Sequence, residues 1–187
     1  MRSRTASRIT GSALLLLASQ ATACGGSSSF ALESPSFERG ARIPDTAAFD
    51  GVGCMGGNHS PQLSIRGVPS DARSLALVLH DPDAPVEGGF DHWVVFDLPP
   101  DTTSLPDGVD PMALGAHEGT NDFGRPGYGG PCPPSGPAHR YVFTLYALDV
   151  PHLSLGPDAT GKALRRAVEG HAIARATLEG TYARTNR

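Results

Sequence analysis

The sequence predicts a mainly β fold, an antiparallel β-sandwich with one helix on its C-terminal side. Glycine (23) and proline (17) are abundant for a chain of 187 residues, which is typical of short strands joined by many turns. Three apolar runs, at 74–81, 92–98 and 139–149, have the alternation and the β-branched or aromatic content of strands. Helical periodicity is convincing only at 159–170, so the pattern favours packed sheets over a helical bundle.

The expected strands follow one another along the chain. Residues 30–37 begin as an edge strand or extended arm, and residues 65–69 form a short strand or the entry to a turn. In "SLALVLHD" (74–81) apolar residues occupy both faces, which indicates a strand buried on both sides. "HWVVFDL" (92–98) alternates again, and "HRYVFTLYALD" (139–149) is the longest β-rich run.

One helix and a last strand complete the predicted fold. Asp158 or Thr160 can cap the start of the helix, and Gly170 can end it. A last strand is expected at 177–182. The apolar positions that recur at helical spacing are Ala159, Ala163, Leu164, Ala167 and Val168.

The N-terminal residues have the three parts of an export signal. Three arginines precede a short apolar run, and small residues lead up to Cys24. We therefore expect a signal peptide at 1–23, although an uncut N-terminus that anchors the chain is the alternative. The rest, 30–187, has the length of one domain with its own hydrophobic core.

The residues around the expected cleavage site, "ATAC" followed by "GGSSS", resemble a bacterial lipobox. In that pattern the cysteine carries the lipid, so Cys24 is the predicted lipidation site and 24–29 a flexible tether. Ala21 stands where leucine is preferred, which leaves open an ordinary cleavage after Ala23. The first reading places an anchored lipoprotein in the cell envelope, and the second a soluble periplasmic or secreted protein.

The charge and the cysteines restrict the possible partners. The net charge is −4, and removal of the arginine-bearing signal makes the remaining chain more acidic still, which disfavours nucleic acid. Membrane contact is expected only through the N-terminal lipid. Cys54 and Cys132 both lie in Gly/Pro-rich loops, and in an exported chain the pair indicates a disulfide. Two free thiols are the alternative, and a zinc site lacks a C-x-x-C partner.

A titratable cluster is expected where three strands end. Asp81 closes one strand, His92 opens the next, and His139 opens the third. If these strands are neighbours, the three side chains meet at one rim beside the loop 127–136. Two imidazoles can donate hydrogen bonds to an anion, and backbone N–H groups of the loop glycines, such as Gly130, can add more. We therefore expect tighter binding of phosphate near pH 6 than near pH 8, about where imidazole titrates.

Other roles for these residues remain open. His92 also fits a core histidine, the aspartates fit turn formers, and His139 fits a strand-end surface residue. Two histidines and a carboxylate are chemically suitable for zinc or iron, although the spacing of a known metal motif is absent. The sequence also lacks a G-x-S-x-G elbow and a phosphate-cradling G-x-x-x-x-G-K-[ST] loop. We therefore expect a non-enzymatic protein without a cofactor.

Several longer stretches resemble the phosphatidylethanolamine-binding protein family, in particular its bacterial, Raf kinase inhibitor-like branch. They are "SLALVLHDPDAP", "GGFDHWVVFDLP", "NDFGRPGYGGPCPPSGPAHRYVFTLYALD" and "EGHAIARATLEGTYAR", with "CMGGNHSPQLS" nearer the N-terminus. The resemblance covers about 30–184 and implies a β-sandwich with a small pocket for phosphate-type head groups. Residues that match the family's pocket are Asp81, Ala84, Pro85, His92, Gly130, His139 and Tyr141.

The function implied is that of an exported binding protein that takes phosphate or a phosphorylated head group and modulates a partner. Kinase inhibition, known for animal members, does not transfer to a chain expected outside the cytoplasm. The cysteine and prolines of the loop "YGGPCPPSG" depart from the family pattern. Two alternatives stay open: a protein-interaction or protease-inhibitor module with a vestigial pocket, and a metal-dependent hydrolase that uses Asp81, His92 and His139.

Overall fold

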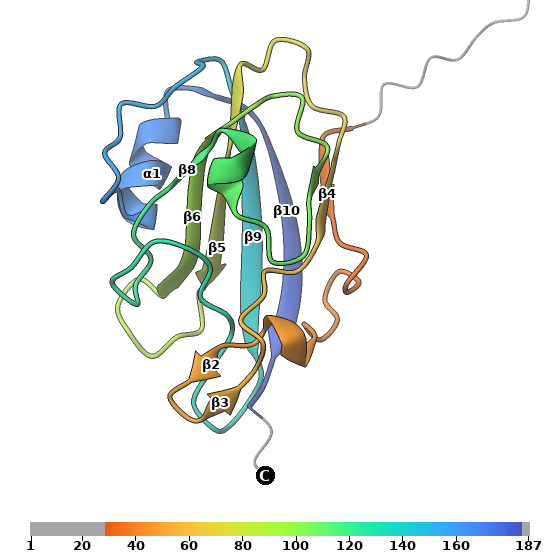
Figure 1. Ribbon diagram of the computed structural model, residues 1–187, viewed down its shortest axis with the longest axis vertical. Coiled ribbons are helices and arrows are strands. Elements are labelled where there is room, and N and C mark those ends of the chain that lie inside the picture. Colours follow the sequence, from red (N-terminus) through yellow and green to blue (C-terminus); the bar gives the residue numbers. More distant parts are fainter. Residues whose placement is uncertain (1–28, 185–187) are drawn as a thin grey trace, which may run out of the picture.

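The computed structural model describes residues 29–184, which form two packed sheets, a small hairpin and one helix (Figure 1). All strand pairings within the sheets are antiparallel. The predicted β-sandwich with a C-terminal-side helix is therefore confirmed. The expected signal peptide 1–23, Cys24 and nearly all of the tether 24–29 lie outside the described residues.

The larger sheet has five strands and carries the three long apolar runs. Its order is β10 (Ala172–Tyr182), β9 (His139–Leu148), β5 (Ser74–Asp81), β6 (Phe90–Leu98) and β8 (His117–Glu118). The smaller sheet has the order β1 (Ala31–Glu33), β4 (Leu63–Arg66) and β7 (Ser104–Leu105). The hairpin consists of β2 (Asp50–Gly51) and β3 (Cys54–Met55).

One α-helix and two short 3₁₀ turns complete the described chain. The helix α1 (Gly161–Val168) packs on the large sheet, and its N-cap Thr160 accepts a hydrogen bond from the Ala163 N–H. Two 3₁₀ turns, η1 (Asp45–Ala47) and η2 (Pro111–Leu114), lie in the connections. No helix in the described part of the chain is long and apolar enough to cross a membrane.

Both faces of the large sheet are covered, which explains why β5 is apolar on both sides. One face contributes Leu75, Leu77 and Leu79 to the core between the sheets, where Trp93 is fully buried. The other face contributes Ala76 and Val78 to a second cluster. That cluster also contains Phe96 of β6 and Leu164 of α1, so the helix seals the outer face.

The observed boundaries differ from the expected ones mainly near the ends of the chain. The last strand begins at Ala172 rather than at position 177, because β9 pairs with it along nearly its whole length. The short strand expected at 65–69 occupies Leu63–Arg66, and the arm at 30–37 contains only the three-residue β1. The strands β2, β3, β7 and β8 were not predicted, since each has only two residues.

Candidate functional site

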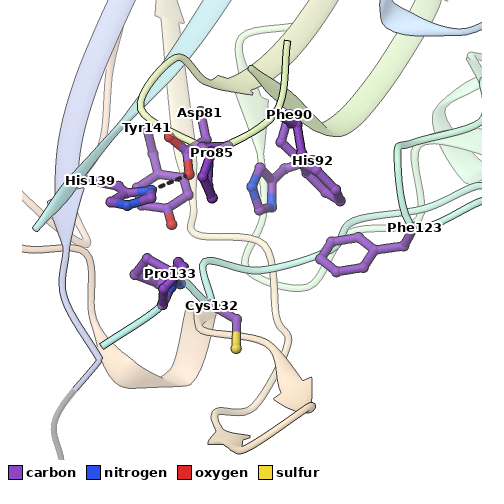
Figure 2. A pocket seen from close by; sticks show the side chains of 12 residues that line it. Asp81, Pro85, Phe90, His92, Phe123, Cys132, Pro133, His139 and Tyr141 are labelled. Atoms are coloured by element: carbon purple, nitrogen blue, oxygen red, sulfur yellow. Dashed lines mark hydrogen bonds and ion pairs between the residues drawn. The ribbon is translucent and has the colours of Figure 1, made fainter. Parts of the chain in front are cut away.

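The sheet order places the three predicted strand ends at one rim. β5 lies between β9 and β6, so the end of β5 meets the starts of both neighbours. Asp81, His92 and His139 there line a cavity of about 140 Å³. Figure 2 shows their side chains together at this rim. The complete lining is Asp81, Ala84, Pro85, Val86, Phe90, His92, Phe123, Cys132, Pro133, Pro134, His139 and Tyr141.

The pocket's carboxylate is paired with one of its histidines. His139 Nδ1 lies 2.8 Å from Asp81 Oδ2, so the ring N–H donates to the carboxylate. The other oxygen of Asp81 accepts a hydrogen bond from the Asp83 N–H at 2.8 Å. Asp81 is thus both a turn former and a pocket residue. Its contact fixes the His139 ring and leaves Nε2 without a hydrogen bond to any described residue.

The turn after β5 is tied to β9 beside the pocket. Arg140 donates to Asp83 through its side-chain Nε at 2.9 Å and its second guanidinium nitrogen at 2.6 Å, and its backbone N–H donates at 2.9 Å. These bonds lower the pKa of Asp83 to about 2. The pair therefore holds the turn that carries Ala84 and Pro85 over the cavity.

His92 is buried and also lines the pocket, so the interpretation as a core histidine and the interpretation as a pocket residue are both correct. Its Nδ1–H donates to the carbonyl of Gly129 at 2.7 Å. Burial lowers the pKa of the imidazole, and the hydrogen bond to Gly129 only partly offsets that effect. His92 is therefore neutral near pH 7, and its Nε2 is then an acceptor rather than the expected donor.

Tyr141 carries a buried hydroxyl that makes no hydrogen bond of normal distance and angle to any described residue, although the Asp81 carboxylate lies near enough to interact with it. The side chain is fully buried in β9 and lines the pocket beside Asp81. Burial raises the pKa of the phenol, and the nearby Asp81 carboxylate raises it further. The hydroxyl thus remains protonated and can donate to a guest, and a buried polar group without a partner costs about 1–3 kcal/mol.

The expectation that the loop glycines point N–H groups at the pocket is wrong. The Gly129 N–H donates to the carbonyl of His92 at 2.9 Å. The Gly130 N–H donates to Asn58 Oδ1 at 2.8 Å, and Gly130 does not line the cavity. The loop packs so closely on residues 47–49 that its N–H groups are used up inside the protein. Gly130 therefore contributes close packing instead of a donor.

The sequence did not predict the aromatic residues that line the pocket. The Phe123 ring lies edge-on to Phe90 and His92, with centroids 4.8 and 5.6 Å apart, and stacks on Phe49 at 4.5 Å. Phe123 reaches the pocket from a loop between β8 and β9 that has no periodic pattern, so no sequence signal indicated it. Together with Pro85, Val86 and the loop prolines, these rings make most of the lining apolar.

The start of β6 is held by a buried ion cluster behind the pocket. Both Asp91 oxygens accept bonds from Arg165 of α1 at 2.8 Å, and His80 Nδ1 lies 2.7 Å from Oδ1. Burial alone would raise the pKa of Asp91, but the bonds and charges of His80 and Arg165 outweigh it and lower the pKa. The cluster thereby fixes the start of β6, where His92 is the next residue after Asp91.

No lysine or arginine of the described chain lines the pocket, whose titratable groups from that part of the chain are one carboxylate, two histidines and one tyrosine. Positive charge and hydrogen-bond donors for an anion in this pocket must therefore come from the two imidazoles and the phenol. Among residues 29–184, no three His, Cys, Asp or Glu side chains are arranged to hold a metal ion. The set of Asp81, His92 and His139 is thus not preformed as a metal centre.

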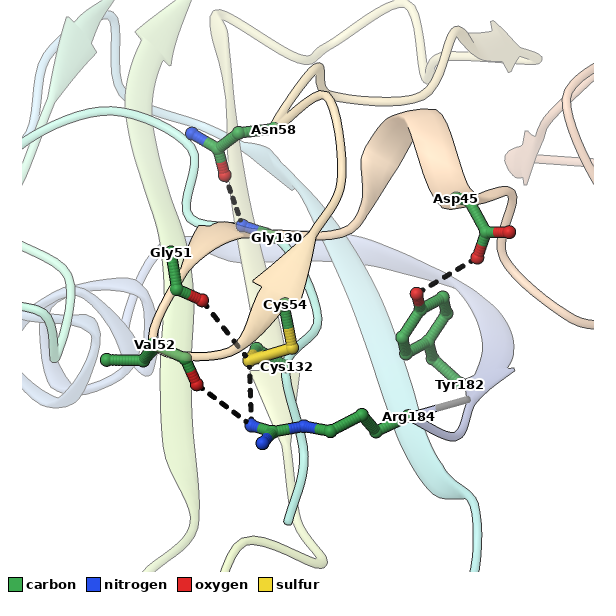
Figure 3. The surroundings of a disulfide bond; sticks show 9 residues. All are labelled: Asp45, Gly51, Val52, Cys54, Asn58, Gly130, Cys132, Tyr182 and Arg184. Atoms are coloured by element: carbon green, nitrogen blue, oxygen red, sulfur yellow. Dashed lines mark hydrogen bonds between the residues drawn. A yellow bond between two sulfur atoms is a disulfide. The ribbon is translucent and has the colours of Figure 1, made fainter. Parts of the chain in front are cut away.

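A disulfide between Cys54 and Cys132, as predicted, joins the hairpin to the pocket wall (Figure 3). Cys132 lines the cavity, and Cys54 lies in β3. The loop 127–136 forms the expected wall through Cys132, Pro133 and Pro134. The Cys–Pro–Pro sequence is therefore the part of this loop that contacts the cavity.

The fold and the pocket define an antiparallel β-sandwich with a small, mostly apolar cavity at one rim of its larger sheet. The family model described as phosphatidylethanolamine-binding protein matches residues 33–183. The chain therefore belongs to the phosphatidylethanolamine-binding protein family.

Relatives from bacteria and archaea are similar along most of the chain. A UPF0098 protein of Methanothermobacter thermautotrophicus is 46% identical over 156 residues, which cover 82% of this chain and 98% of that protein. The UPF0098 protein YbhB of Escherichia coli is 37% identical over 147 residues, 76% of this chain and 93% of that protein. These names state no activity.

Solved structures confirm the fold. The crystal structure of Escherichia coli YbcL, described as a member of the mammalian PEBP family, matches with a TM-score of 0.80 and 35% identity. The match covers 84% of this chain and 100% of that chain. The homologue CT736 from Chlamydia trachomatis matches with a TM-score of 0.75 and 39% identity, over 83% and 98% of the two chains.

Proposed function

We propose that this chain is a non-enzymatic binding protein whose rim pocket takes phosphate or the phosphoryl part of a head group. The observation that carries the proposal is the Tyr141 hydroxyl, which has no hydrogen bond of normal geometry to the described residues, in a pocket also lined by His92 and His139, whose hydrogen bonds of normal geometry within the same residues use only Nδ1. A guest with several oxygens satisfies all three groups at once. The apolar rings and prolines around them lower the local polarity, which strengthens each hydrogen bond.

The state of His92 specifies which phosphate species fits. The neutral ring accepts at Nε2, because its Nδ1–H is already donated to Gly129. A hydrogen phosphate or a protonated monoester can donate its P–O–H to that nitrogen, while Tyr141 donates to another of its oxygens. His139 already donates its Nδ1–H to Asp81, so it donates to the guest at Nε2 in its imidazolium form, which the Asp81 carboxylate favours. A fully ionised oxyanion has no proton to give, so it binds only if His92 itself takes up a proton.

Removal of the Tyr141 hydroxyl tests the proposal without disturbing the fold. Tyr141→Phe should weaken binding of inorganic phosphate by about fivefold, the value of one lost hydrogen bond, while stability stays unchanged or rises. Titration calorimetry measures the first effect and thermal unfolding the second. The matched control is Tyr128→Phe: its hydroxyl donates to the Ala47 carbonyl at 2.9 Å and lies outside this pocket, so stability should fall and phosphate affinity should not.

A second pair of variants tests the histidines. His139→Ala should weaken phosphate binding by about 1–3 kcal/mol, the range for charge-assisted hydrogen bonds. The control is His171→Ala, because His171 also pairs with an aspartate, Asp149 at 3.0 Å, but is exposed away from the pocket. Wild-type affinity for phosphate in a variant that lacks both His92 and His139 contradicts the proposed function.

The lowered pKa of His92 predicts a difference between phosphate and sulfate. Sulfate carries no exchangeable proton at these pH values, so its binding requires the imidazolium form of His92. Because burial lowers the pKa of His92 below its usual value of about 6.5, sulfate affinity should rise by up to about tenfold per unit as the pH falls toward the lowered pKa, and it should level off below that pKa. At about pH 7.5 phosphate should bind more tightly than sulfate. Calorimetry with both anions measures this, and equal pH profiles for the two contradict it.

We also propose that the protein is exported and held at a membrane through lipid on Cys24. The support is the sequence of the N-terminal segment, whose cysteine directly follows the expected cleavage site. Cys24→Ser should move the protein from the detergent phase to the aqueous phase in a phase partition of cells that produce it. Mass spectrometry that finds an unacylated Cys24 at the N-terminus of the mature protein contradicts the anchor.

A further inference from the structure

Arg184 places a positive charge against one sulfur of the disulfide. A terminal guanidinium nitrogen lies 3.1 Å from Cys132 Sγ and 3.3 Å from the carbonyl of Val52 (Figure 3). Within residues 29–184, the buried Nε of the same side chain has no hydrogen-bond partner and no carboxylate forms an ion pair with the guanidinium group. A neutral disulfide compensates this charge poorly, whereas a thiolate at Cys132 compensates it well.

The same sulfur belongs to the segment 132–138, which we call the wall and of which Cys132, Pro133 and Pro134 line the pocket. Just before this wall the loop is held by two hydrogen bonds, since the Phe49 N–H donates to the Pro131 carbonyl and the Gly130 N–H donates to the side-chain Oδ1 of Asn58. Within the wall Pro133, Pro134 and Pro137 have no N–H to donate. The disulfide is therefore the covalent attachment of the wall to the hairpin.

We propose that the bond between Cys54 and Cys132 is a site of thiol–disulfide exchange that controls the pocket, with Arg184 stabilising the Cys132 thiolate. Oxidised, the bond fixes Pro133 and Pro134 against the cavity. Reduced, it releases the wall and loosens the site. This control of the pocket rests on the proposed anion binding, but the exchange chemistry at Cys132 does not.

The exchange takes a dithiol as its reductant. A thiolate of the dithiol bonds to Cys132 Sγ, which is the less buried of the two sulfur-bearing residues, and the bond to Cys54 breaks. The second sulfur of the dithiol then attacks the first, closes the reductant's own disulfide and expels Cys132 as a thiolate beside Arg184. Two electrons pass to the protein. Of the two thiol protons of the reductant, one ends on Cys54 and one enters the solvent.

The charge of Arg184 provides a test that needs no ligand. In protein with Cys24→Ser and Cys54→Ser, Cys132 is the sole thiol, and its alkylation by iodoacetamide across pH gives its pKa. The pKa should lie at least about one unit below the ordinary cysteine value of about 8.5, and Arg184→Gln should return it toward that value. Arg184→Lys, which keeps the charge, should retain most of the shift. A Cys132 pKa that Arg184→Gln leaves unchanged overturns the proposal.

The coupling to the pocket is tested with inorganic phosphate. Full-length mature protein reduced by dithiothreitol, and a Cys54→Ser/Cys132→Ser variant, should each bind phosphate about fivefold or more weakly than the oxidised protein. Equal affinity of the oxidised and reduced forms overturns the coupling. If even the oxidised protein binds no phosphate, the proposed function is wrong. Amide hydrogen exchange at residues 135–140 then decides the inference, because reduction must still speed exchange there.

Discussion

Replacement of both Cys54 and Cys132 with serine is expected to lower the free energy of unfolding by about 4 kcal/mol. The bond joins positions 78 residues apart, and in the chain-entropy model closing a loop of this length constrains the unfolded chain by about that amount. The native state also loses an anchor, since the wall 132–138 lacks backbone donors at its three prolines. The loss should therefore be near the upper end of the range for native disulfides.

Denaturant unfolding at equilibrium measures this effect, with oxidised protein as the reference. The matched control is Cys24→Ser, which removes the third cysteine of the chain without touching the bond and should leave stability unchanged. A double-serine variant that loses less than about 1 kcal/mol shows that the unfolded chain is already restricted or that the bond is strained. Reduction of the unchanged protein should reproduce the stability of the double-serine variant.

The large sheet could be predicted from the sequence because the burial of its faces requires apolar residues at regular positions along each strand. β5 must be apolar on both faces, since the inner core and α1 cover them. Once the three long strands were placed, the meeting of Asp81, His92 and His139 required only that the strands be neighbours. Strand ends are fixed by backbone geometry, so residues there are the part of a site that local pattern predicts best.

Contacts made by residues in loops could not be predicted in this way. Phe123 and Arg184 reach the site from segments whose path depends on tertiary packing. The prediction that the Gly130 N–H donates to a guest was wrong, because this N–H donates to the side chain of Asn58, which is 72 residues away in the sequence. His92 shows the same limit, since its protonation depends on burial that spacing does not reveal.

Gly130→Ala is expected to lower the free energy of unfolding by about 3 kcal/mol, the upper part of the range for overpacking. A Cβ at this position would lie 2.5 Å from Phe49 N and 2.6 Å from the Ala48 carbonyl carbon, and closer still to the Ala47 oxygen. These are backbone atoms, which cannot rotate away as the end of a side chain can. Relief requires the loop to move outward, which stretches the bond from Gly130 to Asn58.

The same displacement should weaken phosphate binding, because Gly130 stands two residues before Cys132 and its neighbour Gly129 holds the His92 ring through its carbonyl. The control is Gly170→Ala, where a Cβ would meet nothing within 4 Å and stability should stay within about 0.5–1 kcal/mol of wild type. Thermal unfolding and phosphate titration of the two variants measure both effects. Wild-type stability of the Gly130 variant contradicts the close approach of this loop to residues 47–49, and wild-type affinity contradicts the dependence of the His92 ring on the loop's position.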